Sequence, residues 1–177
     1  MSDVFFDEGD DPLRDPFATA FLARLRNRAE AWTMDVRPID TGVETMPDPV
    51  AARVFVPGLS GTVTALWVLC QHPPERPPVL HGSWGDRTYV GDDHGRDPLR
   101  DLTVSGVPST AEELADLAAR WFELHLRTDI YRDEWNRGPW SRRDAYGTVP
   151  PFRKGARTLT RSVLERSAGT ATGEQLI

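Results

Sequence analysis

The chain has 177 residues, a formal net charge of −6 and a hydrophobic fraction of 39%, with six Trp, seven Phe and three Tyr. This length is enough for one domain with a sizeable core, and a single cysteine excludes an internal disulfide framework and any multi-cysteine zinc or iron–sulfur site. No apolar run approaches the roughly 20 residues that span a bilayer, so a protein without a membrane segment is expected, and the single cysteine makes a reducing cytoplasm the default compartment.

The distribution of apolar residues predicts one folded domain between two polar ends. The acidic N-terminal segment, residues 1–14, and the polar C-terminal tail, residues 167–177, lack apolar periodicity and should fray unless a partner orders them. Residues 15–166 should form a single α+β domain. Within it, residues 137–155 are punctuated by Gly and Pro and are expected to form an irregular basic and aromatic segment.

A first helix is predicted to begin at Asp15 and Pro16. An Asp oxygen can accept hydrogen bonds from the free N–H groups of a first turn, and Pro is tolerated at the first helical position. Apolar residues then recur at three-to-four spacing and should face the core: Phe17, Phe21, Leu25, Ala29 and Trp32. The intervening Arg24, Arg26 and Arg28 should stay mostly outside it.

The apolar period then changes from 3.6 to 2, which is typical of strands. Residues 32–36 alternate and predict a half-buried strand closed by Pro38, and a second strand is predicted at residues 52–56, after a loop that contains Gly42. Residues 62–72 are apolar on both faces near their middle. This third strand should therefore be central and covered by another layer.

Further strand material is expected at residues 79–84 and 87–90, with a bulge or tight turn at Gly85. After a second major helix, a charged strand at residues 128–135 should lie at a sheet edge. A short third helix is predicted at residues 156–166.

The second major helix is predicted to begin at two overlapping capping boxes, in which Ser109 pairs with Glu112 and Thr110 with Glu113. Its apolar side should consist of Leu114, Leu117, Ala118, Trp121, Leu124 and His125. A lone helical His next to a Trp favours a packed core residue over a metal ligand.

Together these elements predict an α+β fold. The links between consecutive strands are too short for the crossover helices of a parallel sheet. The expected architecture is an antiparallel β-meander of about four to five strands with helices packed mainly on one face.

Charge is distributed unevenly along the chain. Residues 1–119 contain ten Arg against twenty acidic residues, whereas residues 120–177 contain eleven basic residues against seven acidic ones. Seven of those bases and one acid, Asp144, lie within residues 137–161. This asymmetry suggests either a surface for a partner or an internal clamp that pairs with the acidic half of the chain.

The candidate partner-binding residues in and beside this region are Trp135, Arg137, Trp140, Arg142, Arg143, Tyr146, Phe152, Arg153, Lys154 and Arg157. Their guanidinium and aromatic groups could bind phosphates and stack the bases of a single-stranded nucleic acid. The internal clamp is favoured, because a nucleic-acid module usually has a basic overall balance. An acidic protein partner is a third possibility. Twenty arginines beside one lysine indicate a high-GC bacterial genome, which weakens arginine content as functional evidence.

A second candidate site is a loop with two His and three Asp within fourteen residues: His81, Asp86, Asp92, Asp93 and His94. Imidazole nitrogen and carboxylate oxygen suit zinc, manganese or iron, so a metal-dependent enzyme is an alternative function. The spacing matches no established ligand motif, however, and Asp-Asp-His-Gly is also good turn chemistry. The turn is the favoured interpretation, and no metal is assigned.

Other catalytic motifs are incomplete. Cys70 and His72 share one strand face, but Cys70 lies in the most apolar strand, where a thiol is usually an inert small hydrophobe. Ser83 lacks the G-x-S-x-G spacing of a nucleophile elbow. No Gly-rich phosphate loop is present, and no cofactor is implied.

The run WFELHLR at residues 121–127, followed by RDEW at residues 132–135, resembles a helix-to-strand segment in small uncharacterised proteins of high-GC bacteria. The resemblance covers about fifteen residues, under a tenth of the chain, and implies neither a function nor a site residue. It agrees with the bacterial origin indicated by the ratio of arginine to lysine.

These observations favour a non-enzymatic cytoplasmic protein of the accessory, adaptor or immunity kind, which binds another protein through a charge-polarised surface. Trp and Arg are the residue types that dominate interface hot spots. Two alternatives remain open. One is the binding of single-stranded nucleic acid or a phosphate ligand through residues 137–161, and the other is a metal-dependent enzyme at the loop of His81.

Overall fold

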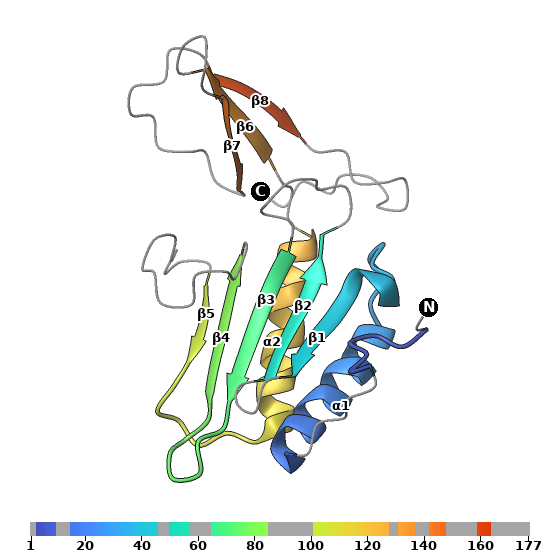
Figure 1. The fold of residues 1–177 in the computed structure, drawn as a ribbon, viewed down its shortest axis with the longest axis vertical. Coiled ribbons are helices and arrows are strands. Elements are labelled where there is room, and N and C mark those ends of the chain that lie inside the picture. Colours follow the sequence, from blue (N-terminus) through green and yellow to red (C-terminus); the bar gives the residue numbers. More distant parts are fainter. Residues whose placement is uncertain are drawn as a thin grey trace.

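The computed structural model describes residues 3–9, 15–45, 50–56, 65–84 and 101–127, together with the backbone of residues 131–136, 142–147 and 159–163 (Figure 1). The described elements in chain order are α1 (Pro16–Glu30), the 3-10 helix η1 (Pro38–Asp40), β1 (Thr41–Thr45), β2 (Val50–Phe55), β3 (Ala65–Gln71), β4 (Val79–Trp84), β5 (Leu102–Val104), α2 (Ala111–Arg127), β6 (Tyr131–Asn136), β7 (Arg142–Gly147) and β8 (Leu159–Val163).

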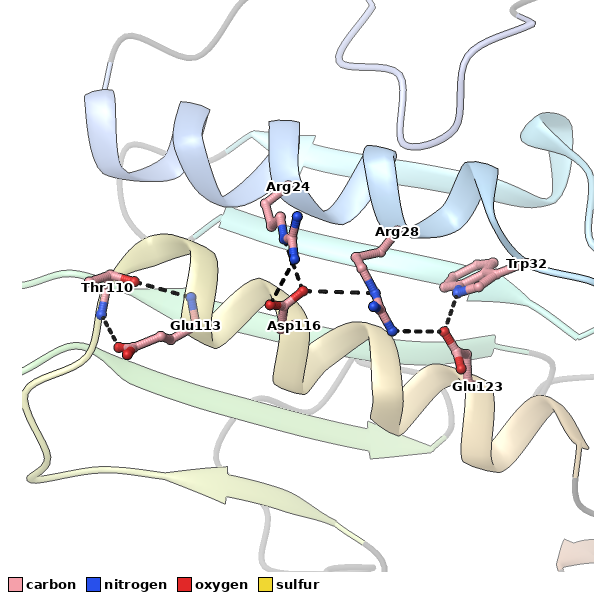
Figure 2. A network of polar contacts seen from close by, with 7 residues as sticks. All are labelled: Arg24, Arg28, Trp32, Thr110, Glu113, Asp116 and Glu123. Atoms are coloured by element: carbon pink, nitrogen blue, oxygen red, sulfur yellow. Dashed lines mark hydrogen bonds and ion pairs between the residues drawn. The ribbon is translucent and has the colours of Figure 1, made fainter.

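Five strands form one antiparallel sheet in the order β1-β2-β3-β4-β5, so each strand pairs with its neighbours in the sequence. Strand β3 is central, as predicted, and both helices pack against one face of the sheet (Figure 2). The predicted α+β meander is therefore confirmed. Strand β5 is absent from the predicted elements, whereas Gly85 and residues 87–90 lie outside the described residues.

The hydrophobic core lies between this sheet and the two helices. Because successive side chains of a strand point to opposite faces, every second residue of β2 and β3 enters the core, together with Leu80 of β4. The largest strand and helix residues of the core, all fully buried, are Val54, Leu66, Val68, Leu80, Phe21, Leu22, Leu25, Leu114, Phe122 and Leu126. Among the described residues, neither helix combines the length and apolar composition that crossing a membrane requires.

Helix α1 begins as predicted. The carboxylate of Asp15 accepts hydrogen bonds from the N–H groups of Phe17 and Ala18, at 3.3 and 3.0 Å, and Pro16 occupies the first turn. Of the predicted apolar stripe, Phe21, Leu25 and Ala29 are buried, while Phe17 and Trp32 are half-buried at its two ends.

Helix α2 begins at Ala111, and only the second predicted capping box forms. The N–H of Thr110 donates to Glu113 Oε2 at 2.9 Å, and the N–H of Glu113 donates to Thr110 Oγ1 at 3.2 Å (Figure 2). The Ser109 hydroxyl donates instead to the Val107 carbonyl at 3.4 Å. One helix has one N-cap position, so Thr110 occupies it and Ser109 lies outside the helix.

The predicted apolar side of α2 is correct except at Leu124, whose side chain is 63% exposed. Leu114, Ala118, Trp121 and His125 are buried, and Leu117 is half-buried. The remaining core positions are filled by residues that the prediction omitted: Ala111, Ala115, Ala119, Phe122 and Leu126. The buried side is therefore rotated toward α1, and Leu124 is left outside it.

The strand predicted at residues 32–36 is wrong. The Trp32 N–H donates to the Ala29 carbonyl at 3.0 Å and the Val36 N–H to the Met34 carbonyl at 2.8 Å, so these hydrogen bonds stay within local turns. Val36 is buried and Trp32 and Met34 pack against the core, which explains the alternation. The pattern indicated burial but not strand pairing. Strand β1 begins only at Thr41, in the segment assigned to a loop.

The N-terminal segment does not fray where it is described. Phe6 is fully buried; its ring stacks on Phe122 with centroids 6.0 Å apart and meets Trp32 edge-on at 6.1 Å. The Phe6 N–H donates to Thr41 Oγ1 at 2.8 Å, and its carbonyl accepts two hydrogen bonds from Arg26, which also pairs with Glu8. Two adjacent aromatics, too few to show periodicity, hold residues 3–9 in place.

The C-terminal strands form a separate three-stranded antiparallel sheet in the order β7-β6-β8. Three predictions are corrected here. Strand β6 is the middle strand and not an edge, residues 142–147 are a strand inside the segment expected to be irregular, and residues 159–163 are a strand where a helix was predicted. The polar tail from residue 167 lies outside the described residues.

Candidate functional site

The sheet face opposite α1 and α2 carries a second, smaller apolar cluster. Ala51, Ala65 and Trp67 are buried there, with Leu69 packed against them. These residues alternate along β2 and β3 with those that enter the main core, so their side chains point away from the helices. We call this surface the outer face and define it by Arg53, Phe55, Trp67, Leu69 and His81.

Arg53 organises the outer face. Its guanidinium carbon lies 4.9 Å from the ring centroid of Phe55 and 5.4 Å from that of Trp67. Phe55 is two residues along the same strand, and Trp67 is directly opposite Arg53 on β3. A cation held over aromatic faces at these distances gains roughly 0.5–1 kcal/mol at an exposed position. The three side chains thus form a preassembled Arg–aromatic cluster.

The neighbouring strand β1 makes room for this arginine. Arg53 Nη1 donates to Glu44 Oε1 at 3.2 Å, and Gly42 is the residue opposite Arg53 in the register. A Cβ on Gly42 would lie 2.9 Å from Arg53 Nε, so glycine allows the guanidinium to lie close against the sheet. The buried Nε has no hydrogen-bond acceptor among the described residues.

Exposure differs strongly within this cluster. Phe55 is 38% exposed, whereas Trp67 is only 8% exposed. The ring of Phe55 is therefore accessible from solvent, whereas Arg53 lies over the buried ring of Trp67. The cluster combines one cationic and two aromatic groups.

His81 is half-buried on β4, opposite Leu69 of β3 and Thr103 of β5, and so also belongs to the outer face. It is the one member of the predicted metal loop whose placement is described. Asp86, Asp92, Asp93 and His94 lie outside the described residues, so their approach to His81 stays a prediction. Within the described part of the chain, no group of three or more His, Cys, Asp or Glu side chains could hold a metal ion.

The Cys70–His72 dyad is not supported. Cys70 is buried in the core, whereas His72 is exposed and stacks on Phe17, with ring centroids 4.1 Å apart and an interplanar angle of 11°. His125 is buried in α2, with its ring centroid 4.6 Å from that of Trp121, as expected for a packed core histidine.

A second polar cluster lies between the helices (Figure 2). Arg24 Nε and Nη2 donate to the two carboxylate oxygens of Asp116 at 2.9 and 3.0 Å, and Arg28 reaches both Asp116 and Glu123. Trp32 Nε1 donates to Glu123 Oε1 at 3.0 Å. The hydrogen bond from Arg24 lowers the pKa of Asp116, and Asp116 raises that of Arg24. Arg24 and Arg28, predicted to stay outside, join α1 to α2.

The predicted Arg–aromatic segment is described only in part. The backbone register places Trp135 of β6 opposite Arg143 of β7 and Leu159 of β8, and Tyr146 opposite Arg132. Arg142 also lies on β7, opposite Asn136. Arg137, Trp140, Phe152, Arg153, Lys154 and Arg157 lie outside the described residues.

The cluster of Arg53, Phe55 and Trp67 was missing from the predicted site. Its signal was present in β2, where Ala51, Arg53 and Phe55 alternate with three core residues. An Arg and a Phe on the side of a strand that points away from the core indicate a contact surface. Their meeting with Trp67 depends on the pairing of β2 with β3, which alternation within one strand does not reveal.

Comparison with known proteins identifies no relative of this chain. No family model, no curated protein and no solved structure matches the chain.

Proposed function

We propose that this chain is a non-enzymatic interaction protein that binds a partner protein through the outer face. The observation that carries the proposal is the Arg53–Phe55–Trp67 cluster on the sheet face opposite both helices. Trp and Arg are enriched among residues that dominate binding energy, and aromatic residues are enriched at the centre of interfaces.

The location of the cluster supports this proposal. Arg53, Phe55 and Trp67 lie on two adjacent central strands, whose backbones are held by pairing on both sides. A site on a paired sheet loses little conformational entropy on binding, because its side chains are already positioned. The surface ion pair of Arg53 with Glu44 could exchange for a carboxylate of the partner, since such exposed pairs contribute little.

An accessory, adaptor or immunity role in the cytoplasm fits the composition of the chain. Its net charge of −6 would favour association with a basic partner, and its single cysteine suits a reducing compartment. The partner would then meet an acidic protein whose outer face carries one preassembled arginine.

Affinity capture with matched variants tests the proposal. The wild-type protein is immobilised beside Phe55→Ala, Arg53→Ala and Ile39→Ala variants and exposed to host lysate. Ile39 is half-exposed on η1, outside the outer face, and serves as the control. A genuine partner should be retained by the wild type and the control and lost with Phe55→Ala. Purified partner should then bind Phe55→Ala at least about tenfold more weakly. Equal retention by all variants would reject the outer face.

A second candidate function is binding of single-stranded nucleic acid by the three-stranded sheet. The observation that favours it is the register, which pairs Trp135 with Arg143 and Tyr146 with Arg132 across neighbouring strands. Because positions 132 and 135 of β6 are three residues apart, the two pairs belong to opposite faces of the sheet, and each combines one arginine with one aromatic residue, as a phosphate contact with base stacking requires. Titration with labelled single-stranded oligonucleotides at two salt concentrations tests it. Affinity should fall steeply with salt. Binding that is absent, or independent of salt, would end this alternative.

A further inference from the structure

One side of α2 presents a row of residues at the margin of the core. Glu113, Leu117, Arg120, Leu124 and Arg127 recur at alternating spacings of four and three, which places them along one stripe of the helix. We call this stripe the α2 flank. Glu113, Arg120, Leu124 and Arg127 are exposed, and Leu117 is half-buried. At 63%, Leu124 is the most exposed of the large apolar residues that the structure describes.

The two leucines of the α2 flank lie beside the contact between α2 and α1. Asp116 and Glu123 mark the side of α2 that contacts α1, because they pair with Arg24 and Arg28 (Figure 2). Each helical residue is turned by about 100° from the one before, so Leu117 and Leu124 lie about a quarter turn from that contact. Only two α-helices are present among the described elements, and the contact of α2 with α1 does not include these two leucines.

The flank continues onto the edge of the sheet. A Cβ on Gly82 would meet both Leu102 of β5 and the ring of Trp121, at 3.0 and 3.2 Å, so β5 lies beside the Trp121 side of α2. Leu102 and Val104 are half-buried hydrophobic residues that pack against the core cluster, as does Leu117. The apolar surface at the α2 flank is therefore wider than Leu124 alone.

The flank is complementary to itself. When two copies of α2 run antiparallel with a two-fold axis near Arg120, Leu117 of one copy faces Leu124 of the other, and Glu113 faces Arg127. Each apolar residue then meets an apolar one and each acid meets a base. Arg120 faces its own copy, and its long side chain can turn toward solvent while its methylene groups stay in contact.

We propose that the α2 flank binds a second copy of this chain, with the two α2 helices antiparallel about a two-fold axis near Arg120. The proposal is independent of the outer face, which lies on the other side of the sheet and remains free for a partner. The contact is narrow and rests on two leucines per copy, so the dimer is weak and its population rises with concentration.

Sedimentation across a range of concentrations tests the dimer. The wild-type mass should rise from 19.8 kDa toward twice that value. Leu124→Glu places a carboxylate against Leu117 of the other copy and should keep the protein monomeric, while the Ile39→Glu control, at a half-exposed apolar position on η1, should behave like the wild type. A wild type that stays monomeric, or a Leu124→Glu variant that still dimerises, would overturn the proposal.

Cross-linking then tests the geometry. Under mild oxidation, Arg120→Cys should form a disulfide-linked dimer, because residue 120 lies next to its own copy at the axis. Asn27→Cys, exposed on α1, is the matched control and should not cross-link, and the native Cys70 is buried. Arg127→Glu should weaken the dimer, more so at low salt, because it brings acidic groups together at each end of the helix pair. Equal cross-linking of both cysteine variants would reject the antiparallel arrangement.

Discussion

Phe6 is the one non-glycine residue with a positive φ among those that the structure describes. Its φ of 51° lies in the left-handed region, which costs a non-glycine residue about 1–2 kcal/mol. The conformation persists because the ring is fully buried and because Thr41 and Arg26 bind the backbone on both sides of the residue. The burial of one aromatic ring outweighs the backbone strain, and it attaches the N-terminal segment to the core.

Phe6→Ala should lower the free energy of unfolding by about 3–5 kcal/mol, since it removes a fully buried ring and leaves a cavity beside Phe122 and Trp32. Urea denaturation followed by Trp fluorescence measures the change. Val4→Ala, half-exposed two residues earlier, is the control and should change stability by less than about 0.5 kcal/mol. Equal stability of both variants would show that the N-terminal segment does not stabilise the core.

Thr110→Ala should cost about 0.5–2 kcal/mol of unfolding free energy, because it removes the hydroxyl that accepts from the Glu113 N–H at the start of α2. Ser109→Ala is the matched control. Its exposed hydroxyl donates only a 3.4 Å bond to Val107, so its loss should have little effect. If Ser109→Ala lowered the free energy of unfolding more than Thr110→Ala does, Ser109 rather than Thr110 would be the N-cap residue.

At the scale of elements, the contact between α1 and α2 combines an apolar interior with an ion-pair seam. Arg24, Arg28, Asp116 and Glu123 are all partly exposed, so each pair adds little by itself. Their geometry nevertheless sets the relative position of the helices, because Arg24 binds both oxygens of Asp116.

The stability that the ion-pair seam gives to the fold should depend on pH through the Asp116 carboxylate. Its pKa in the folded state is lowered from 3.8, chiefly by the hydrogen bond from Arg24. The contribution of the ionised Asp116 carboxylate to the free energy of unfolding is therefore fully present above the pKa of this group in the unfolded chain. It is lost as pH falls through the lower pKa that the group has in the folded protein. Asp116→Asn should be less stable than the wild type at neutral pH, and the difference should shrink below pH 3.8.

Urea denaturation at neutral and acidic pH measures this difference. Asp3→Asn, which neutralises an exposed carboxylate near the N-terminus, is the control and should track the wild type at both pH values. If Asp116→Asn lowers the free energy of unfolding by the same amount at neutral and at acidic pH, the ion pair with Arg24 is not the cause of the loss.

At the scale of the whole molecule, the two sheets differ in how they are supported. The five-stranded sheet has two helices on one face and a continuous core, and its middle strands are paired on both sides. The three-stranded sheet holds β6 between β7 and β8, and among the described strands each of these two outer strands pairs only with β6.

Hydrogen exchange should follow this architecture, because amides paired within a covered sheet open only with the core. The amides of β3 should exchange more slowly than those of β5, and the amides of β6 more slowly than those of β7 and β8. Exchange followed by mass spectrometry or NMR measures the order. Faster exchange in β3 than in β5 would contradict the strand order of the sheet.

Features that depend on near neighbours were predictable from the sequence. Helix α1 begins after Asp15 and helix α2 after Thr110, and both starts were predictable because each of these residues forms hydrogen bonds with the first turn of its own helix. Cys70 and His125 are buried as predicted, because the apolar residues around them in the sequence indicate burial. Alternation alone failed at residues 32–36, since side chains can alternate in burial without their backbone pairing with another strand.

The sequence by itself determined the α+β class, the central position of β3 and the helix starts, because periodicity and capping act over a few residues. Only the tertiary structure decided which distant residues meet. Arg24 and Asp116 are 92 positions apart, and Arg53 reaches Trp67 only through the register of β2 with β3. It also decided that Leu124 is exposed while Phe6 is buried. Such contacts depend on how whole helices and strands pack against one another, which the spacing of residues within one element does not determine.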